Sequence, residues 1–182
     1  SEVARAATPP GWLAVELSSF QLHDCPDLMP AVGILTNLAP DHLDRYPDLA
    51  SYYADKARLF ARAAGTSCWV TNLDDPDSRR MIASVPGRHL AFTVAPGVRA
   101  DAWYDRAAGQ LMLAGAPLLP RAELPLLGDH NVANVLAAAL ALHATGIGHE
   151  ALATGIRSFR PMAHRLEPVR EVDGVLRVND SK

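Results

Sequence analysis

Polar side chains that could perform acid–base or metal chemistry crowd one short stretch, residues 36–46. Asp41, His42 and Asp44 lie in it, directly after the continuous apolar run 31–35, which predicts a buried strand. Ligands of open α/β sheets bind at the carboxyl ends of the strands. The stretch is therefore a candidate site loop, although acids that cap the following helix are an equally good interpretation of the same residues.

A further carboxylate, Glu16, lies near the end of the short β-rich run 12–17. For a lone glutamate, a solvated strand end is the simpler interpretation. The alternative is that two neighbouring strand ends present Glu16, Asp41 and His42 to one cation. Carboxylate oxygens suit Mg²⁺, with water and phosphate completing its shell, and the imidazole of His42 also suits Mn²⁺ or Zn²⁺.

Lys56 lies on the apolar stripe of a predicted helix, one helical stride from Tyr53 and Phe60. A lysine in such a position usually extends its ammonium group to water. The alternative is that its nitrogen points into a site, where burial favours the neutral amine, which can be chemically modified.

Asn131 and Asn134 lie near the start of a strongly apolar helix, 132–144. Asn131 could simply be the helix N-cap. Asn134 would lie inside the first turn of a buried helix and would need a partner. An amide offers both a donor and an acceptor, as reading an adenine edge requires.

Beyond a predicted boundary at 160–161, polar groups concentrate at His164, Arg165 and residues 179–182. They could be ordinary surface charges. The functional alternative is an arginine and a lysine placed near a phosphate.

Strands alternate with helices along the chain, which predicts an α/β fold with a mostly parallel sheet flanked by helices. The predicted strands are 12–17, 31–35, 68–71 and 89–94, followed by a hairpin over 102–119 that turns at 108–109 and a second hairpin over 165–178 that turns at 173–174. The predicted helices are 48–64, 74–85, 132–144 and 149–158.

Size and composition restrict the class of protein. The 182 residues suffice for one domain plus the beginning of another, and the formal net charge of −3 without a Lys/Arg run argues against nucleic-acid and membrane-surface partners. Two well-separated cysteines, Cys25 and Cys68, are typical of a reduced, cytosolic protein. The sequence contains neither a Gly-rich phosphate loop nor a G-x-S-x-G elbow. Because it starts at Ser1 without Met, we expect an excised piece.

Five segments, in this order, resemble the Mur ligase family, the ATP-dependent amide-forming enzymes of peptidoglycan precursor synthesis. They are 16–22, 37–45, 53–56, 128–134, and 164–165 together with 179–182. Segment 16–22 is similar to the members that add D-glutamate to UDP-N-acetylmuramoyl-L-alanine. The resemblance implies that 1–160 is the central ATP-binding domain without its phosphate loop, and that 161–182 begins a C-terminal α/β domain that binds the amino acid.

The resemblance also implies a mechanism and its residues. ATP would phosphorylate the substrate carboxylate, and the amine of D-glutamate would attack the acyl phosphate. Glu16, His42 and a carbamylated Lys56 would hold Mg²⁺, and Asp41 would orient His42. Ser18 would touch the muramoyl substrate. Asn131 and Asn134 would contact the adenine, and the rest of the nucleotide would be bound by Arg165, Asp180 and Lys182. The full-length enzyme would be a cytoplasmic monomer and this piece inactive alone. The alternatives are a non-catalytic nucleotide-binding module and a metal-dependent hydrolase.

Overall fold

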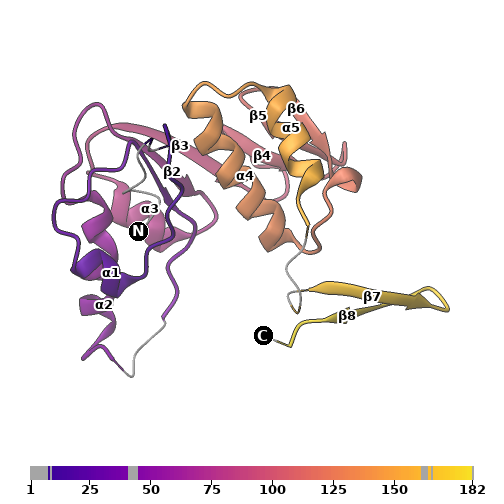
Figure 1. Cartoon of the computed structure of the whole chain (residues 1–182), viewed down its shortest axis with the longest axis horizontal. Helices are drawn as coiled ribbons and strands as arrows, with labels where there is room; N and C mark the ends of the chain where they lie inside the picture. Colours follow the sequence, from indigo (N-terminus) through magenta and orange to yellow (C-terminus); the bar gives the residue numbers. More distant parts are fainter. Residues whose placement is uncertain (1–7, 9, 41–44, 161–163, 165, 182) are drawn as a thin grey trace. The chain divides into compact units, whose positions relative to one another are not determined.

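The computed structural model describes residues 8, 10–40, 45–160, 164 and 166–181 of the chain (Figure 1). The chain divides into two compact units. The first unit consists of Ser1–Leu28 and Pro40–Arg62, and the second unit of Met29–Ala39 and Ala63–Lys182.

A mixed sheet forms the centre of the second unit. Within the described residues its six strands are β1 (Val32–Leu35), β2 (Cys68–Asn72), β3 (Arg88–Thr93), β4 (Ala102–Asp105), β5 (Gln110–Leu113) and β6 (Ala116–Pro120). Their order in the sheet is their order in the chain; β1 to β4 pair in parallel, and β4, β5 and β6 pair antiparallel. The predicted α/β class is confirmed, and the predicted hairpin is a three-stranded meander because β6 follows β5 at once.

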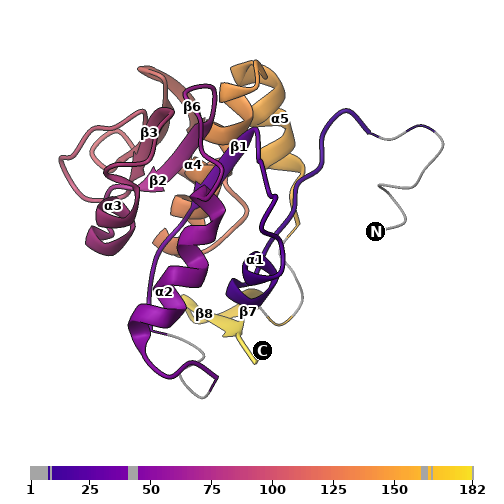
Figure 2. The same cartoon turned by 90° about the vertical axis from the view of Figure 1, so that its left-hand side faces the viewer.

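Three of the described helices cover this sheet. Helix α4 (Asp129–Ala144) crosses strands β1 to β5, α5 (His149–Ser158) packs on α4 and β6, and α3 (Pro76–Ile82) packs against β2. Figure 2 shows α3 and α4 on opposite sides of β2. Side chains alternate along a strand, so Val70 of β2 and Phe92 of β3 join Leu136 of α4 in the main core. The indole of Trp69, adjacent to Val70, donates instead to the Pro86 carbonyl at 2.9 Å.

The predicted C-terminal hairpin is confirmed as a separate two-stranded antiparallel sheet, β7 (Glu167–Val172) and β8 (Val175–Asn179). Asp173 and Gly174 join the strands with φ angles of 52° and 77°, as a two-residue turn with both central residues left-handed requires. The domain boundary at residue 160 stays a prediction.

The first unit contains α1 (Ser19–His23), α2 (Leu49–Ala57) and the 3₁₀ turn η2 (Arg58–Phe60). The predicted start of the second helix is confirmed, because the Asp48 carboxylate caps α2 by accepting the Ser51 N–H at 2.7 Å. The predicted end near residue 64 is wrong: the chain tightens into η2 after Ala57. On α2 the buried ring is Tyr52, whereas Tyr53 is half-buried.

Two strand predictions need correction. Residues 12–17 form no strand, because a strand needs ladder hydrogen bonds from a neighbour and within the described residues none pairs with this run; Trp12 and Val15 are more than half exposed. Strand β1 was expected to be covered on both faces, yet Ile34 is 40% exposed while Leu35 is buried. Among the strands described, β1 lies at the edge of the sheet, and α4 covers one of its faces.

The expected all-round burial of the apolar helix is also wrong. Asn134, Ala138 and Leu142, spaced four residues apart on α4, form an exposed stripe, because the sheet and α5 each cover only part of the helix. No helix in the described part of the chain is long and apolar enough to cross a membrane.

Candidate active site

A cavity of about 320 Å³ lies in the first unit, between the segment before α1, α1 itself and α2. It is lined by Glu16, Leu17, Ser18, Ser19, Gln21, Tyr52 and Lys56. Three residues singled out from the sequence, Glu16, Ser18 and Lys56, therefore share one cavity. The sheet does not bring them together, since Glu16 ends no strand.

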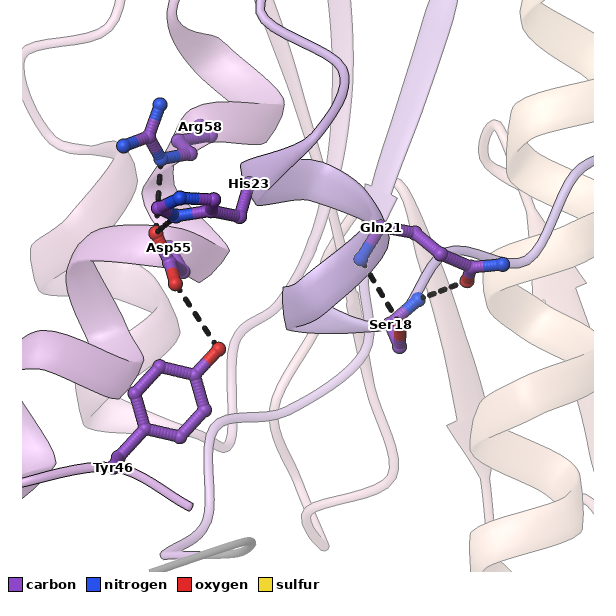
Figure 3. Close-up of polar contacts among 6 residues, drawn as sticks. All are labelled: Ser18, Gln21, His23, Tyr46, Asp55 and Arg58. Atoms are coloured by element: carbon purple, nitrogen blue, oxygen red, sulfur yellow. Dashed lines mark hydrogen bonds and ion pairs between the residues drawn. The ribbon is translucent and has the colours of Figure 1, made fainter.

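Reciprocal hydrogen bonds at the start of α1 fix the polar wall of this cavity (Figure 3). The Ser18 hydroxyl oxygen accepts the Gln21 N–H at 3.2 Å, and the Gln21 side-chain oxygen accepts the Ser18 N–H at 2.9 Å. This capping box turns the chain into a helix two residues after Glu16. Because Ser18 acts there as an acceptor, its hydroxyl hydrogen is still able to donate to a ligand.

Ser19 is a lining residue that sequence reasoning missed. It is 1% exposed, and its hydroxyl has no hydrogen-bond partner within the described residues. Buried hydroxyls are normally satisfied by protein, water or ligand. The sequence carried a signal, since Ser19 follows Ser18 at a predicted turn, but nothing in the pattern distinguished the two hydroxyls.

Lys56 occupies the last turn of α2 and is half-buried. Its ammonium nitrogen lies 5.8 Å from the centroid of the Tyr52 ring, a cation–π arrangement. It is one of two lysines in a sequence with fifteen arginines. A lysine amine can lose its proton and react, which a guanidinium cannot do in proteins.

Asp55, the neighbour of Lys56 on α2, collects three donors on its carboxylate (Figure 3). The contacts are His23 Nδ1 at 2.8 Å, Arg58 Nε at 2.9 Å and the Tyr46 hydroxyl at 3.1 Å. Burial acts to raise the pKa of Asp55, but the hydrogen bonds from His23, Arg58 and Tyr46 outweigh it and leave the pKa lowered.

In the second unit, the Asp75 carboxylate holds the chain just after β1. It accepts the Leu38 N–H at 2.6 Å and the Ser78 hydroxyl at 2.5 Å, and it caps α3 by accepting the Asp77 N–H at 3.2 Å. Burial acts to raise the pKa of Asp75, and these hydrogen bonds more than offset it, so that the pKa is lowered.

Asp41 and His42 lie outside the described residues, between Leu38 and Tyr46 in the sequence. Within the residues that are described, no group of three or more His, Cys, Asp or Glu side chains could hold a metal ion. The cavity residues fit Mg²⁺ chemically, because a carboxylate is its preferred protein ligand and Mg²⁺ keeps several waters. At roughly 30 Å³ per water, the cavity has room for them.

A larger cavity of about 880 Å³ lies in the second unit along α4 and α5. It contains three predicted nucleotide residues, Asn131, Asn134 and Asp180, and the rest of its lining is mainly apolar: Leu124, Leu126, His130, Val135, Ala138, Ala139, Leu142, Ile147, Ala151, Leu152, Gly155, Ile156, Phe159 and Leu166.

The two asparagines differ from expectation. Asn131 is not the N-cap of α4; Gly128 is, with a φ of 80°. The Asn131 side-chain amide donates to the Leu127 carbonyl at 2.7 Å, which leaves its oxygen available as an acceptor. Asn134 was expected to be buried, but it lies on the exposed stripe of α4. Asp180 accepts the Leu166 N–H at 3.2 Å, whereas Arg165 and Lys182 lie outside the described residues.

Residues 5–142 match the family described as "Mur ligase middle domain". The chain belongs to the Mur ligase family. A relative from Acidobacterium capsulatum, named UDP-N-acetylmuramoylalanine–D-glutamate ligase, is 38% identical over 178 residues, which cover 94% of this chain and 38% of that protein. A relative of the same name from Thiobacillus denitrificans is 39% identical over 181 residues, covering 100% of this chain and 37% of that protein.

Solved structures agree with this Mur ligase assignment. The structure of a UDP-N-acetylmuramoyl-L-alanyl-D-glutamate–2,6-diaminopimelate ligase superposes with a TM-score of 0.68 at 25% identity, covering 86% of this chain and 34% of that one. The chain thus spans little more than a third of the length of the curated relatives it matches.

Proposed function

We propose that the whole protein containing this chain is an ATP-dependent ligase that joins D-glutamate to UDP-N-acetylmuramoyl-L-alanine in peptidoglycan precursor synthesis. The observation that carries the proposal is the 39% identity, over the full length of this chain, with a ligase named for adding D-glutamate. The cavity that gathers Glu16, Ser18 and Lys56 supports it.

The reaction must bring anions together. ATP transfers its terminal phosphoryl group to the substrate carboxylate, giving ADP and an acyl phosphate. The amine of D-glutamate then attacks the acyl carbon, the new C–N bond forms, and inorganic phosphate leaves as the nitrogen gives up its proton. Positive charge that is fixed before the reaction lowers the cost of each step.

In this proposal Glu16, His42 and Lys56 would hold Mg²⁺, or Mn²⁺ in its place, and Asp41 would orient His42. The ion supplies positive charge that offsets the phosphate oxygens. Ser18 would donate its hydroxyl hydrogen to the muramoyl substrate, since the oxygen already serves the capping box as an acceptor.

Lys56 would carry a carbamate, formed when its neutral amine attacks carbon dioxide and releases a proton. This modification converts a cation into an anion that can face the metal. The position of Lys56 in the cavity wall, together with Glu16 and Ser18, supports this role. Lys56→Ala should abolish activity, with no recovery on adding bicarbonate, whereas full activity would remove the carbamate. A carbamate signal in the NMR spectrum after adding labelled bicarbonate would report the modification itself.

The cavity along α4 and α5 would take the adenine of ATP. Asn131 and Asn134 would bond the base edge, the apolar wall would cover its faces, and Arg165, Asp180 and Lys182 would serve the rest of the nucleotide. Residues 1–160 would then be the central ATP-binding domain and 161–182 the start of the amino-acid-binding domain. We place the enzyme in the cytoplasm as a monomer without nucleic-acid or membrane partners.

The test is phosphate release by the purified product of the whole gene. Release should require both UDP-N-acetylmuramoyl-L-alanine and D-glutamate. Release that proceeds equally well without D-glutamate refutes the assignment, and ATP binding without any turnover would indicate a nucleotide-binding module instead.

A further inference from the structure

The carboxylate of Asp55 joins its own segment, α2 with η2, to two other segments of the first unit. Its two oxygens contact His23 at the end of α1, Tyr46 ahead of α2 and Arg58 in η2. The Asp55 side chain is 14% exposed, whereas the side chains of His23 and Arg58 are 57% and 41% exposed. Asp55 lines neither cavity of the candidate site and is not among the residues singled out for chemistry.

Asp55 and Lys56 are consecutive on α2 and therefore point about 100° apart around the helix axis. Lys56 lines the cavity together with Glu16 and Ser18, which belong to the segment before α1 and its N-cap. Asp55 holds the same two elements together outside the cavity, because His23 belongs to α1. The cavity lies between α1 and α2, and the Asp55–His23 contact is one of the contacts that join these two helices.

An aromatic cluster links Asp55 to Lys56 by a second route. The Tyr46 ring, whose hydroxyl donates to Asp55, stacks on Phe20 of α1 with centroids 5.3 Å apart and meets the edge of Tyr52 at 5.4 Å. The Tyr52 ring in turn lies beneath the Lys56 nitrogen, at 5.8 Å. A hydrogen bond that fixes Tyr46 therefore fixes the ring on which Lys56 rests.

We propose that Asp55 is a positioning residue that holds Lys56 in the cavity wall beside Glu16 and Ser18. This inference rests on the proposed function, in which Lys56 serves the metal site. Contacts made directly to a metal ligand typically change metal affinity or activity by ten- to a hundredfold when removed. Asp55 acts one step further out, through Tyr46 and Tyr52, so the lower end of that range is expected.

The decisive variant is Asp55→Asn in the product of the whole gene. An amide has nearly the same shape, but its nitrogen cannot accept the hydrogen bonds that one carboxylate oxygen accepts now. Asp27→Asn is the matched control: Asp27 pairs with Arg62 at 2.7 Å in the same unit, is 87% exposed and lies outside the cavity. Tyr46→Phe is the milder second variant, since it removes a single hydroxyl.

The readout is the Mg²⁺ concentration that gives half-maximal phosphate release, together with kcat at saturating Mg²⁺. Asp55→Asn should raise this concentration up to about tenfold, with kcat at saturation largely retained. Asp27→Asn should leave both unchanged, and Tyr46→Phe should raise the concentration roughly threefold. A variant that loses kcat or melting temperature with an unchanged Mg²⁺ requirement would show that Asp55 only stabilises the fold, and would overturn the proposal. If Asp55→Asn does not fold, an unchanged Mg²⁺ requirement in Tyr46→Phe overturns it.

A second readout is independent of activity. The rate at which an amine-specific reagent labels Lys56, followed by mass spectrometry, should rise several-fold in Asp55→Asn and stay at the wild-type value in Asp27→Asn, with Lys182 as the internal reference. Equal labelling of Lys56 in Asp55→Asn and wild type would refute the positioning role. Absence of D-glutamate-dependent turnover in the wild-type protein would refute the proposed function alone. The labelling rate of Lys56 would then still test whether Asp55 positions Lys56.

Discussion

Replacing Asp75 by alanine should release the chain that follows β1. The carboxylate accepts the N–H of Leu38 and the hydroxyl of Ser78, and both of these residues are buried. It also caps α3. Loss of an N-cap costs about 1 kcal/mol, and each buried donor left without a partner costs about 1–3 kcal/mol. We expect Asp75→Ala to reduce the free energy of unfolding by roughly 4–5 kcal/mol, of which about 2 kcal/mol is local to Leu38.

Hydrogen exchange at individual amides measures the local part. A loss of about 2 kcal/mol corresponds to exchange of the Leu38 amide roughly 30-fold faster, since 1.4 kcal/mol is a factor of ten. Asp74 is a matched control in the same turn: its carboxylate accepts the Val94 N–H at 2.8 Å and the Thr93 hydroxyl. Asp74→Ala should therefore accelerate the Val94 amide and spare Leu38, and Asp75→Ala should do the reverse.

The pattern of acceleration decides whether this reasoning holds. Unchanged exchange at Leu38 in Asp75→Ala would mean that the 2.6 Å contact does not hold the chain after β1. Equal acceleration of Leu38 and Val94 by both variants would mean that the whole turn opens as one, so that neither carboxylate has a separate partner.

Three further predictions concern stability. The hydrogen bonds of Asp75 lower its pKa despite burial. Its contribution to stability is therefore present above the unfolded pKa of about 4 and is lost as the pH falls through the lower pKa of the folded state. Asp75→Asn should make the stability measured by acid titration fall less steeply in that pH range. Leu136→Ala should cost about 3 kcal/mol in thermal unfolding, whereas Leu142→Ala on the exposed stripe of the same helix should cost under about 1 kcal/mol. Gly87→Ala should cost about 2 kcal/mol in the same assay, because φ is 128° there and an added Cβ would lie 2.7 Å from the Ser67 carbonyl oxygen.

The elements that the sequence predicts well carry strong local signals. The apolar runs of β2 and β3, the Asp48 cap of α2 and the Asp173–Gly174 turn each determine a local conformation, and all appear as predicted. Residues 12–17 carry an equally strong β-type signal but form no strand, because a strand also needs a partner that the pattern of its own residues does not contain.

In the candidate site, too, some residues could be predicted from the sequence and others could not. Glu16, Ser18 and Lys56 can be predicted to belong together, since their types and order match a family motif, and one cavity contains them. The hydrogen-bonding roles of Asp55 and Asp75 could not be predicted, because an aspartate on a helix is usually a surface charge and an aspartate at a helix start is usually an N-cap. Their roles depend on donors that are distant in sequence: His23 lies 32 residues from Asp55, and Leu38 lies 37 residues from Asp75.

These two carboxylates each accept a hydrogen bond from a described residue that lies in a loop, not in a strand of the sheet. The residues on either side of Asp41 and His42 are each tied to an acid, Leu38 through its backbone N–H to Asp75 and Tyr46 through its hydroxyl to Asp55. Hydrogen bonds to a charged acceptor are stronger than neutral ones, and both acids have lowered pKa values and stay ionised at neutral pH. Removing one anchor should leave the other intact, because the two acids share no donor. The variants Asp55→Asn and Asp75→Asn should therefore act additively on stability.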